Sequence, residues 1–181
     1  MKLKYECIFL DRDGTINIDP GYISGINDFQ FYDYTFDALQ LLSSLTKYFI
    51  IITNQSGVSR GIIKEEELVK INSFIHAKFL ENKLNLLKIY YCTDIPKNAS
   101  KFRKPGVGMF LQASREHNIN LAKCIMIGDS FIDILPANEL GMDSMLVLTG
   151  KGKVDQNKFD RNCKPDFIAE NLFIGAEELI R

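Results

Sequence analysis

The sequence predicts an α/β fold in which a parallel β-sheet is covered by helices on both faces. Short apolar runs alternate along the chain with longer segments whose apolar residues recur at helical spacing. The short runs, such as "YFIIIT" at 48–53, are apolar at nearly every position, which is typical of strands buried on both faces. The chain has 181 residues, 46% of them hydrophobic, which predicts a single domain spanning 1–181 with one core.

The strands and helices follow from these patterns in chain order. Strands are expected where apolar and β-branched residues concentrate, at 7–10, 48–53, 88–92, 124–129 and 144–149. Helices are expected between them, at 34–45, 65–83, 106–118 and 133–141, with a last one around 177–180. The helix at 65–83 begins with three glutamates, which suit the positive end of a helix dipole. The polar stretches 93–105 and 150–165 are expected to be surface loops.

Composition and charge exclude several classes of protein. The net charge of −1 gives no electrostatic basis for a nucleic-acid partner or an anionic membrane. No apolar run approaches the roughly 20 residues that span a bilayer, and the N-terminal residues do not read as a signal peptide. The four cysteines form no C-x-x-C pair, so free thiols in a reducing compartment are expected. We therefore expect a cytoplasmic protein, and a monomer.

Polar side chains follow four of the predicted strands. Ligands of parallel sheets bind beyond the carboxyl ends of the strands, so these side chains are expected to meet at one edge. Carboxylates there suit a divalent cation, and hydroxyls, amides and basic groups suit phosphate oxygens. In strand order the groups are Asp11 and Asp13; Thr53, Asn54, Gln55 and Ser56; Arg103 and Lys104; and Asp129 and Asp133.

At this point the chain resembles the haloacid-dehalogenase superfamily of phosphotransferases. The resemblance rests on "DRDGT" (11–15), "TNQSG" (53–57), "RKP" (103–105) and "GDSFID" (128–133), and it covers nearly the whole chain. More narrowly, these motifs are similar to those of the D-glycero-D-manno-heptose 1,7-bisphosphate phosphatases and the related histidinol-phosphate phosphatases. The resemblance implies a Rossmann-like sheet with no large cap domain and a Mg²⁺-dependent phosphatase.

The resemblance also implies roles for the motif residues. Asp11 would be the nucleophile that forms an aspartyl-phosphate, and Asp13 the general acid and base. Mg²⁺ would be held by Asp11, the backbone carbonyl of Asp13 and Asp129, with Asp133 beside them. Thr53 would hydrogen-bond the phosphoryl oxygens, and Lys104 would offset the negative charge.

The substrate implied by the resemblance is a small sugar bisphosphate that loses its C7 phosphate, in heptose metabolism for lipopolysaccharide or capsule synthesis. Histidinol phosphate is the alternative. Arg60 and Arg103 are the candidates for the distal phosphate, since arginine suits phosphate geometry. The substrate contacts carried over from the family are Asp19, Gly21, Tyr22, Asn54, Gln55, Ser56 and Arg103.

The chain departs from the family pattern at two places. Many members carry a zinc-binding loop before the arginine and lysine, but here Cys92 alone remains of its four ligands, so no structural zinc is expected. Ser130 stands where the heptose enzymes often have lysine.

Two other classes of protein are less compatible with the sequence. A receiver-type signalling domain would place its phosphorylated aspartate after the third strand, whereas "DRDGT" follows the first strand here. The near-zero net charge argues against a nucleic-acid 3′-phosphatase.

Overall fold

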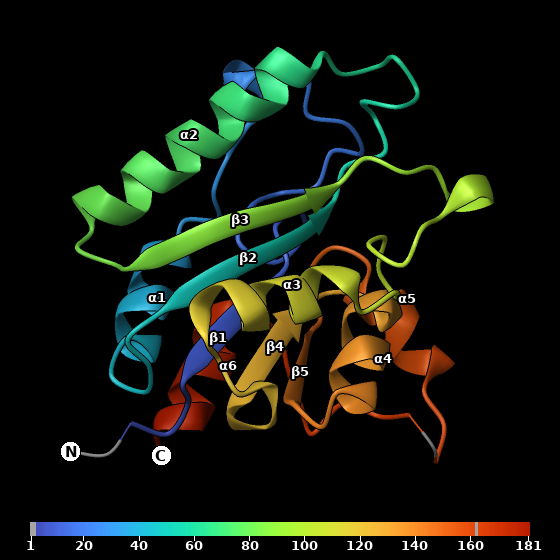
Figure 1. Ribbon diagram of the computed structural model, residues 1–181. Coiled ribbons are helices and arrows are strands. Elements are labelled where there is room, and N and C mark those ends of the chain that lie inside the picture. The colour runs from blue at the N-terminus through green and yellow to red at the C-terminus, as the bar shows by residue number, and fades with distance from the viewer. Residues whose placement is uncertain (1–2, 162) are drawn as a thin grey trace.

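The structure is a computed structural model that describes residues 3–161 and 163–181. In this part of the chain six parallel strands form one sheet, in the order β3-β2-β1-β4-β5-β6 (Figure 1). The fold class predicted from the sequence is therefore confirmed. The strands are β1 Cys7–Leu10, β2 Phe49–Asn54, β3 Leu86–Cys92, β4 Cys124–Gly128, β5 Asp143–Val147 and β6 Phe167–Ala169.

Helices cover both faces of the sheet. The helices are α1 Thr35–Leu42, α2 Glu65–Glu81, α3 Gly108–His117, α4 Phe131–Glu139, α5 Gly152–Asp155 and α6 Leu172–Ile180. Apolar residues of α1, α2 and α6 pack with Ile8, Leu10 and Ile51 on one face. Those of α3 and α4 pack with Phe9 and Ile50 on the other, which is the near side in Figure 1. Burial on both faces explains why the central strands are apolar at nearly every position.

The strand order places a crevice at the end of β1. Chain connections run from β1 outward through β2 to β3 on one side, and from β4 outward to β6 on the other, so the order reverses between β1 and β4. Ligands of open parallel sheets bind at such a reversal. Asp11 directly follows β1 and Asp129 directly follows β4, so both carboxylates lie at this point.

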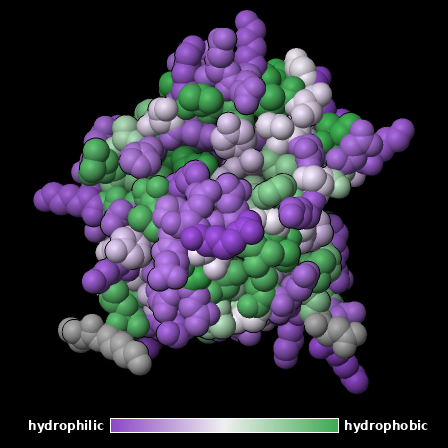
Figure 2. Space-filling view, in the orientation of Figure 1, coloured by the Kyte–Doolittle hydropathy of each residue, from purple (hydrophilic) through white to green (hydrophobic). Residues whose placement is uncertain are grey.

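No large cap domain covers this edge in the described part of the chain. The segment between β1 and α1 holds only the 3₁₀ helix Ile26–Asp28, and the segment between β3 and α3 holds only the 3₁₀ helix Pro96–Asn98. None of the described helices combines the length and the apolar character needed to cross a membrane. Hydrophilic and hydrophobic side chains are interspersed over the face shown in Figure 2.

The sequence did not predict several short elements. β6 has three residues and lies at the edge of the sheet. α5 and the 3₁₀ helix Gln156–Lys158 lie inside 150–165, the stretch that was expected to be a loop. α5 has four residues, of which Gly152 and Asp155 are buried, and the side chains of the 3₁₀ helix are exposed. Elements of three or four residues are too short to leave a periodic apolar pattern in the sequence.

Truncating Phe79 is expected to destabilise the fold, because its ring is fully buried between α2 and the sheet. The Phe79 ring centroid lies 6.2 Å from that of Phe36 and 6.0 Å from that of Phe49. Phe79→Ala should lower the free energy of unfolding by about 3–5 kcal/mol. The matched control is Leu80→Ala on the same helix, where the side chain is 71% exposed and a change within about 0.5 kcal/mol is expected. Urea unfolding of both variants measures this, and equal losses would contradict the packing described.

Candidate active site

A cavity of about 200 Å³ opens at the carboxyl edge of the sheet, above β1, β2 and β4. Nearly all the site residues predicted from the sequence line it. Arg60 does not: it is exposed in the turn that follows β2 and is not among the lining residues. The predicted residues that line the cavity are Asp11, Asp13, Asp19, Gly21, Tyr22, Thr53, Asn54, Gln55, Ser56, Arg103, Lys104, Asp129 and Asp133.

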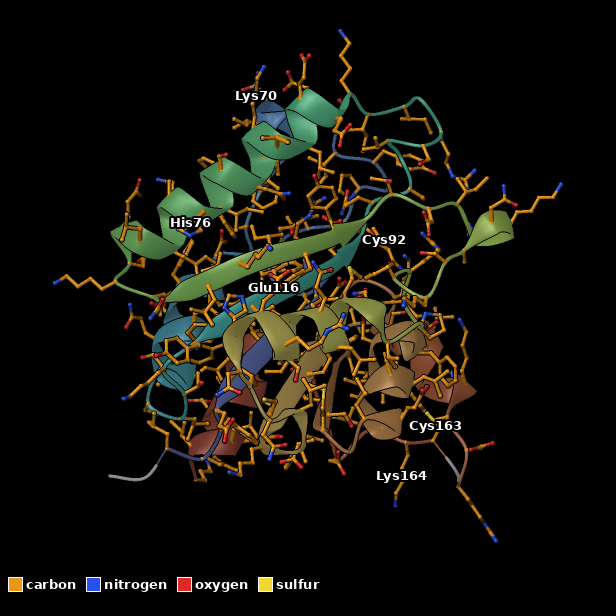
Figure 3. All side chains as sticks on the ribbon, viewed as in Figure 1. Lys70, His76, Cys92, Glu116, Cys163 and Lys164 are labelled. Carbon is orange, nitrogen blue, oxygen red and sulfur yellow. The ribbon has the colours of Figure 1, made fainter. Side chains whose placement is uncertain are left out.

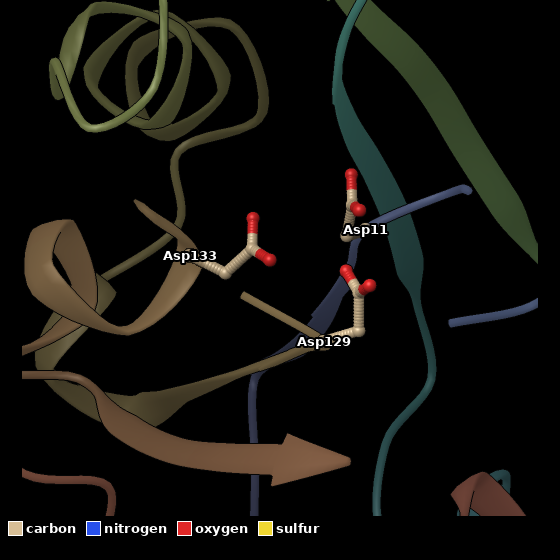
Figure 4. A group of neighbouring side chains, drawn as sticks. All are labelled: Asp11, Asp129 and Asp133. Carbon is tan, nitrogen blue, oxygen red and sulfur yellow. The ribbon is translucent and has the colours of Figure 1, made fainter. Parts of the chain in front are cut away.

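Three buried carboxylates form the floor of the cavity (Figure 4). Asp11, Asp129 and Asp133 each offer an oxygen within 4.8 Å of the others. Burial, together with the neighbouring carboxylates, raises the pKa of Asp11 to about 7 and that of Asp129 to about 8. A divalent cation would relieve this repulsion, and an all-oxygen donor set suits a hard cation such as Mg²⁺. The residues therefore fit the metal that the sequence motifs imply.

Lys104 partly neutralises the triad. Its Nζ donates to Asp11 Oδ1 at 2.6 Å, to Asp133 Oδ1 at 2.6 Å and to the backbone oxygen of Ile52 at 2.7 Å, which uses all three of its hydrogens. Burial alone would lower the pKa of Lys104, because it disfavours the charged ammonium. The carboxylates of Asp11 and Asp133 outweigh this effect and raise that pKa above its usual range. The other oxygen of Asp133 accepts from the backbone N–H of Ser130. Asp133 thus positions Lys104 and the start of α4.

Two glycines let the chain close around Asp129. Gly14 and Gly150 both have positive φ, and a Cβ at either position would overlap the Asp129 carboxylate. Asp129 Oδ2 accepts from the backbone N–H of Lys151 at 2.7 Å, and Thr149 Oγ1 donates to the Gly14 oxygen at 2.6 Å. These contacts connect the loop after β5 to the loop after β1 and to Asp129, so they fix the orientation of the Asp129 carboxylate.

Asp13 has a different environment from the triad. Arg12 donates to it through Nε at 3.0 Å and Nη2 at 2.8 Å, Asn17 Nδ2 donates at 2.9 Å, and Gln55 Nε2 donates at 2.7 Å. Burial would raise the pKa of Asp13, but the Arg12 guanidinium and these hydrogen bonds outweigh it and hold that pKa below its ordinary value. Gln55 Nε2 also donates to Thr53 Oγ1 at 3.0 Å, so it connects two residues of the site.

Several residues expected to contact substrate also hold the site together. Asn54 accepts from the Lys104 backbone N–H and donates to the Lys104 carbonyl, both at 3.0 Å, so its amide fixes the backbone that carries this lysine. Arg103 Nη1 donates to the carbonyl of Asp94 at 2.7 Å. Asp19 Oδ1 accepts from the Gly21 N–H at 2.8 Å, and Tyr22 stands half-exposed at the rim.

Three further residues, which the sequence motifs did not predict, belong to the site. Arg12 is almost fully buried and pairs with Asp13, and Asn17 completes the same cluster. The basic residue between two acids in "DRD" was the available signal for Arg12. Lys151 lines the cavity from the loop after β5, in the stretch expected to be surface, and nothing in the sequence marks it.

Hydrogen bonds hold the loop after β3. Asp94 accepts from the Ser100 backbone N–H at 2.8 Å and from Arg103 through its carbonyl. Cys92 is buried at the end of β3, and Figure 3 shows it well apart from Cys163. Among the described residues, the acidic triad is the group of metal-ligating side chains close enough to share an ion. The absence of a structural zinc stays a prediction.

Sequence relatives decide the family of this chain. It is 35% identical over 172 residues to a D-glycero-β-D-manno-heptose-1,7-bisphosphate 7-phosphatase of Pasteurella multocida, which covers 91% of this chain and 94% of that protein. The chain belongs to this phosphatase family. An enzyme of the same name from Photorhabdus laumondii is 39% identical over 152 residues, covering 80% of this chain and 81% of that protein.

Structural similarity agrees with the sequence relatives. A model of HAD-hydrolase-like proteins matches residues 101–173. A crystal structure of a D,D-heptose 1,7-bisphosphate phosphatase from B. bronchiseptica, in complex with magnesium and phosphate, superposes with a TM-score of 0.86 at 27% identity. The superposition covers 97% of this chain and 98% of that one. The chain is a phosphatase of the haloacid-dehalogenase-like fold, as the motifs predicted.

Gly150→Ala is expected to weaken binding of a divalent cation, because the added Cβ would overlap the Asp129 carboxylate. Gly141→Ala is the matched control, since Gly141 also has positive φ but a Cβ there would meet nothing within 4 Å. Both variants should lose about 1–2 kcal/mol of stability through the backbone. The Mg²⁺ concentration for half-maximal stabilisation against urea should rise about tenfold or more in Gly150→Ala alone. The same Mg²⁺ response in both variants would contradict the arrangement around Asp129.

Stability without metal is expected to fall as pH rises. The pKa values of Asp11 and Asp129, about 7 and about 8, lie above the ordinary value of 3.8, so the native state holds protons that the unfolded state releases. The free energy of unfolding in EDTA should therefore decrease between about pH 4 and pH 8. Excess Mg²⁺ should reverse the trend, because it binds the ionised carboxylates. Urea unfolding at pH 5 and pH 8 measures this, and Asp129→Asn should flatten the EDTA profile. A free energy of unfolding that rises over this pH range in EDTA would show that the carboxylates do not repel one another in the native state.

Proposed function

We propose that the protein is a Mg²⁺-dependent phosphatase that removes the C7 phosphate of D-glycero-D-manno-heptose 1,7-bisphosphate through an aspartyl-phosphate. The observation that carries the proposal is the position of Asp11, which directly follows β1, accepts from Lys104 and lies beside the other two carboxylates of the triad. The relatives that share at least 35% of their residues with this chain over most of its length bear the name of that activity.

The metal would be held by the carboxylates of Asp11 and Asp129 and by the backbone carbonyl of Asp13. Asp133 has one oxygen on Lys104 and the other on Ser130, so it supports the site or binds through water. When bound, Mg²⁺ supplies positive charge that offsets the phosphoryl oxygens and the buried carboxylates.

In the first half-reaction, an oxygen of Asp11 attacks phosphorus and forms the aspartyl-phosphate. The bond from phosphorus to the sugar oxygen breaks, and protonated Asp13 gives its proton to that oxygen. Thr53 Oγ1 accepts from Gln55, which leaves the hydroxyl hydrogen free to donate to a phosphoryl oxygen. Lys104 stays beside Asp11 and offsets the charge of the reacting groups.

In the second half-reaction, water attacks phosphorus and the bond to Asp11 breaks. Asp13 takes the proton from this water and so returns to its protonated form. Its hydrogen bonds from Arg12, Asn17 and Gln55 stabilise the carboxylate that is needed as the base for this step. The residues of one short loop after β1 thus supply both the nucleophile and the general acid and base.

The proposal is tested by phosphate release with Mg²⁺ from both anomers of heptose 1,7-bisphosphate and from histidinol phosphate. We expect turnover on one heptose anomer to exceed that on histidinol phosphate. Asp11→Asn should lose at least about 1,000-fold in kcat, because the amide cannot act as the nucleophile. Asp37→Asn on the exposed side of α1 is the matched control and should retain activity.

The outcomes separate the parts of the proposal. Higher turnover on histidinol phosphate would replace the substrate and leave the chemistry standing. An Asp11→Asn variant as active as the wild type would overturn the mechanism. No turnover on any of the three, with the fold intact by circular dichroism, would remove the heptose assignment.

A further inference from the structure

Four basic side chains line the cavity, and they differ in how firmly they are held. Arg12 is buried and donates two hydrogen bonds to Asp13. Lys104 donates its three hydrogens to Asp11, Asp133 and the backbone carbonyl of Ile52. Arg103 donates to the carbonyl of Asp94. The fourth, Lys151, has a side chain that is 66% exposed, and its Nζ lies 3.9 Å from Asp19 Oδ2, which is beyond hydrogen-bond distance.

The backbone of Lys151 is nevertheless fixed. Its N–H donates to Asp129 Oδ2 at 2.7 Å, and the next N–H, of Gly152, donates to the Thr149 carbonyl at 2.7 Å. The short helix α5 that follows is tied to the start of α4, because Asp155 Oδ2 accepts from Ser130 Oγ at 2.7 Å and from the Phe131 N–H at 2.8 Å. A rigid backbone next to the Asp129 carboxylate therefore carries an exposed ammonium at the rim of the cavity, where its contact with Asp19 is weak.

Among the described side chains, Asp19 is the ion-pair partner of Lys151, and this pair can break at low cost. Asp19 Oδ1 accepts from the Gly21 N–H, so the carboxylate is held in a turn with Oδ2 toward Lys151. An exposed pair at 3.9 Å is weak and screened by salt. A phosphate dianion carries more charge than a carboxylate and more acceptor oxygens, so it would displace Asp19 as the partner of this lysine.

The rest of the rim offers little competition for a second phosphate. Ser130 lines the cavity, but its hydroxyl donates to Asp155. Arg60 does not line the cavity, and Nη1 of Arg103, the other arginine expected to bind this phosphate, donates to the Asp94 carbonyl. Five lining aspartates face four basic side chains. Of these four, Lys151 is the one whose cationic group makes no hydrogen bond within the described part of the chain.

We propose that Lys151 binds the phosphate that is not transferred, and that it sets the preference for a bisphosphate over a monophosphate. The inference rests on the proposed function. The transferred phosphate takes the position beside Asp11 and Thr53, and Lys151 turns from Asp19 to the second phosphate at the rim. Asp19 is then released to accept a hydroxyl hydrogen of the sugar.

The test compares Lys151→Met on heptose 1,7-bisphosphate and on heptose 7-phosphate. For the bisphosphate, kcat/KM should fall about 10- to 100-fold, mostly through a higher KM, since the contact is the same in the ground state and the transition state. For the monophosphate the change should stay below about twofold. Lys151→Arg should restore most of the loss, and Lys153→Met, a nearby exposed lysine outside the cavity, is the matched control.

The half-saturating Mg²⁺ concentration is a second measurement. It should be unchanged in Lys151→Met, because the backbone N–H, and not the side chain, holds Asp129. Equal losses on both substrates, or no loss on either, would overturn the inference while wild-type turnover of the bisphosphate upholds the proposed function. A wild type that does not hydrolyse the bisphosphate would instead overturn the proposed function, and the inference with it.

Discussion

The contact between the Lys104 ammonium and the carboxylates of Asp11 and Asp133 is the interaction on which the site depends. With all three carboxylates ionised, the single ammonium would leave two net negative charges in a buried cluster, and burying unpaired charge is costly. The fold thereby maintains a deficit of positive charge at the point where a divalent cation and a phosphate would meet. The raised pKa values of Asp11 and Asp129 are the measure of that deficit.

The sheet makes this costly arrangement possible. β1 is buried on both faces and pairs with β2 and β4 along its length, so the chain has little freedom where Asp11 begins. Gly14 and Gly150 then allow two loops to approach the Asp129 carboxylate more closely than any side chain would permit. The amide of Asn54 fixes the backbone of Lys104 from the end of β2. Rigid elements hold each charged group, as a preorganised site requires.

The sequence predicted the parts of this arrangement that depend on burial and on strand order. Continuous apolar runs identified the five longer strands, and the polar residues after four of them line one cavity, as expected. The sequence could not predict the direction of loop side chains, because a loop has no periodicity that assigns its residues to a face. For this reason Arg60 was expected in the site, whereas Lys151 was missed. β6 and α5 are too short to leave a pattern.

Asp11 and Asp13 show how one loop can give two carboxylates different properties. Only one residue separates them, yet burial among like charges raises the pKa of Asp11, and Arg12 with Asn17 and Gln55 lowers that of Asp13. The negative charge of Asp11, the proposed nucleophile, is therefore not fully offset until a cation binds. The carboxylate of Asp13, the proposed acid and base, is already stabilised as an anion by its hydrogen bonds. In the proposed mechanism Asp13 carries a proton to release the sugar, so bound substrate would have to weaken its contacts with Arg12 or Gln55. The Arg12 pair would then link binding of the substrate to the protonation of Asp13, and it would stabilise the base proposed for the second half-reaction.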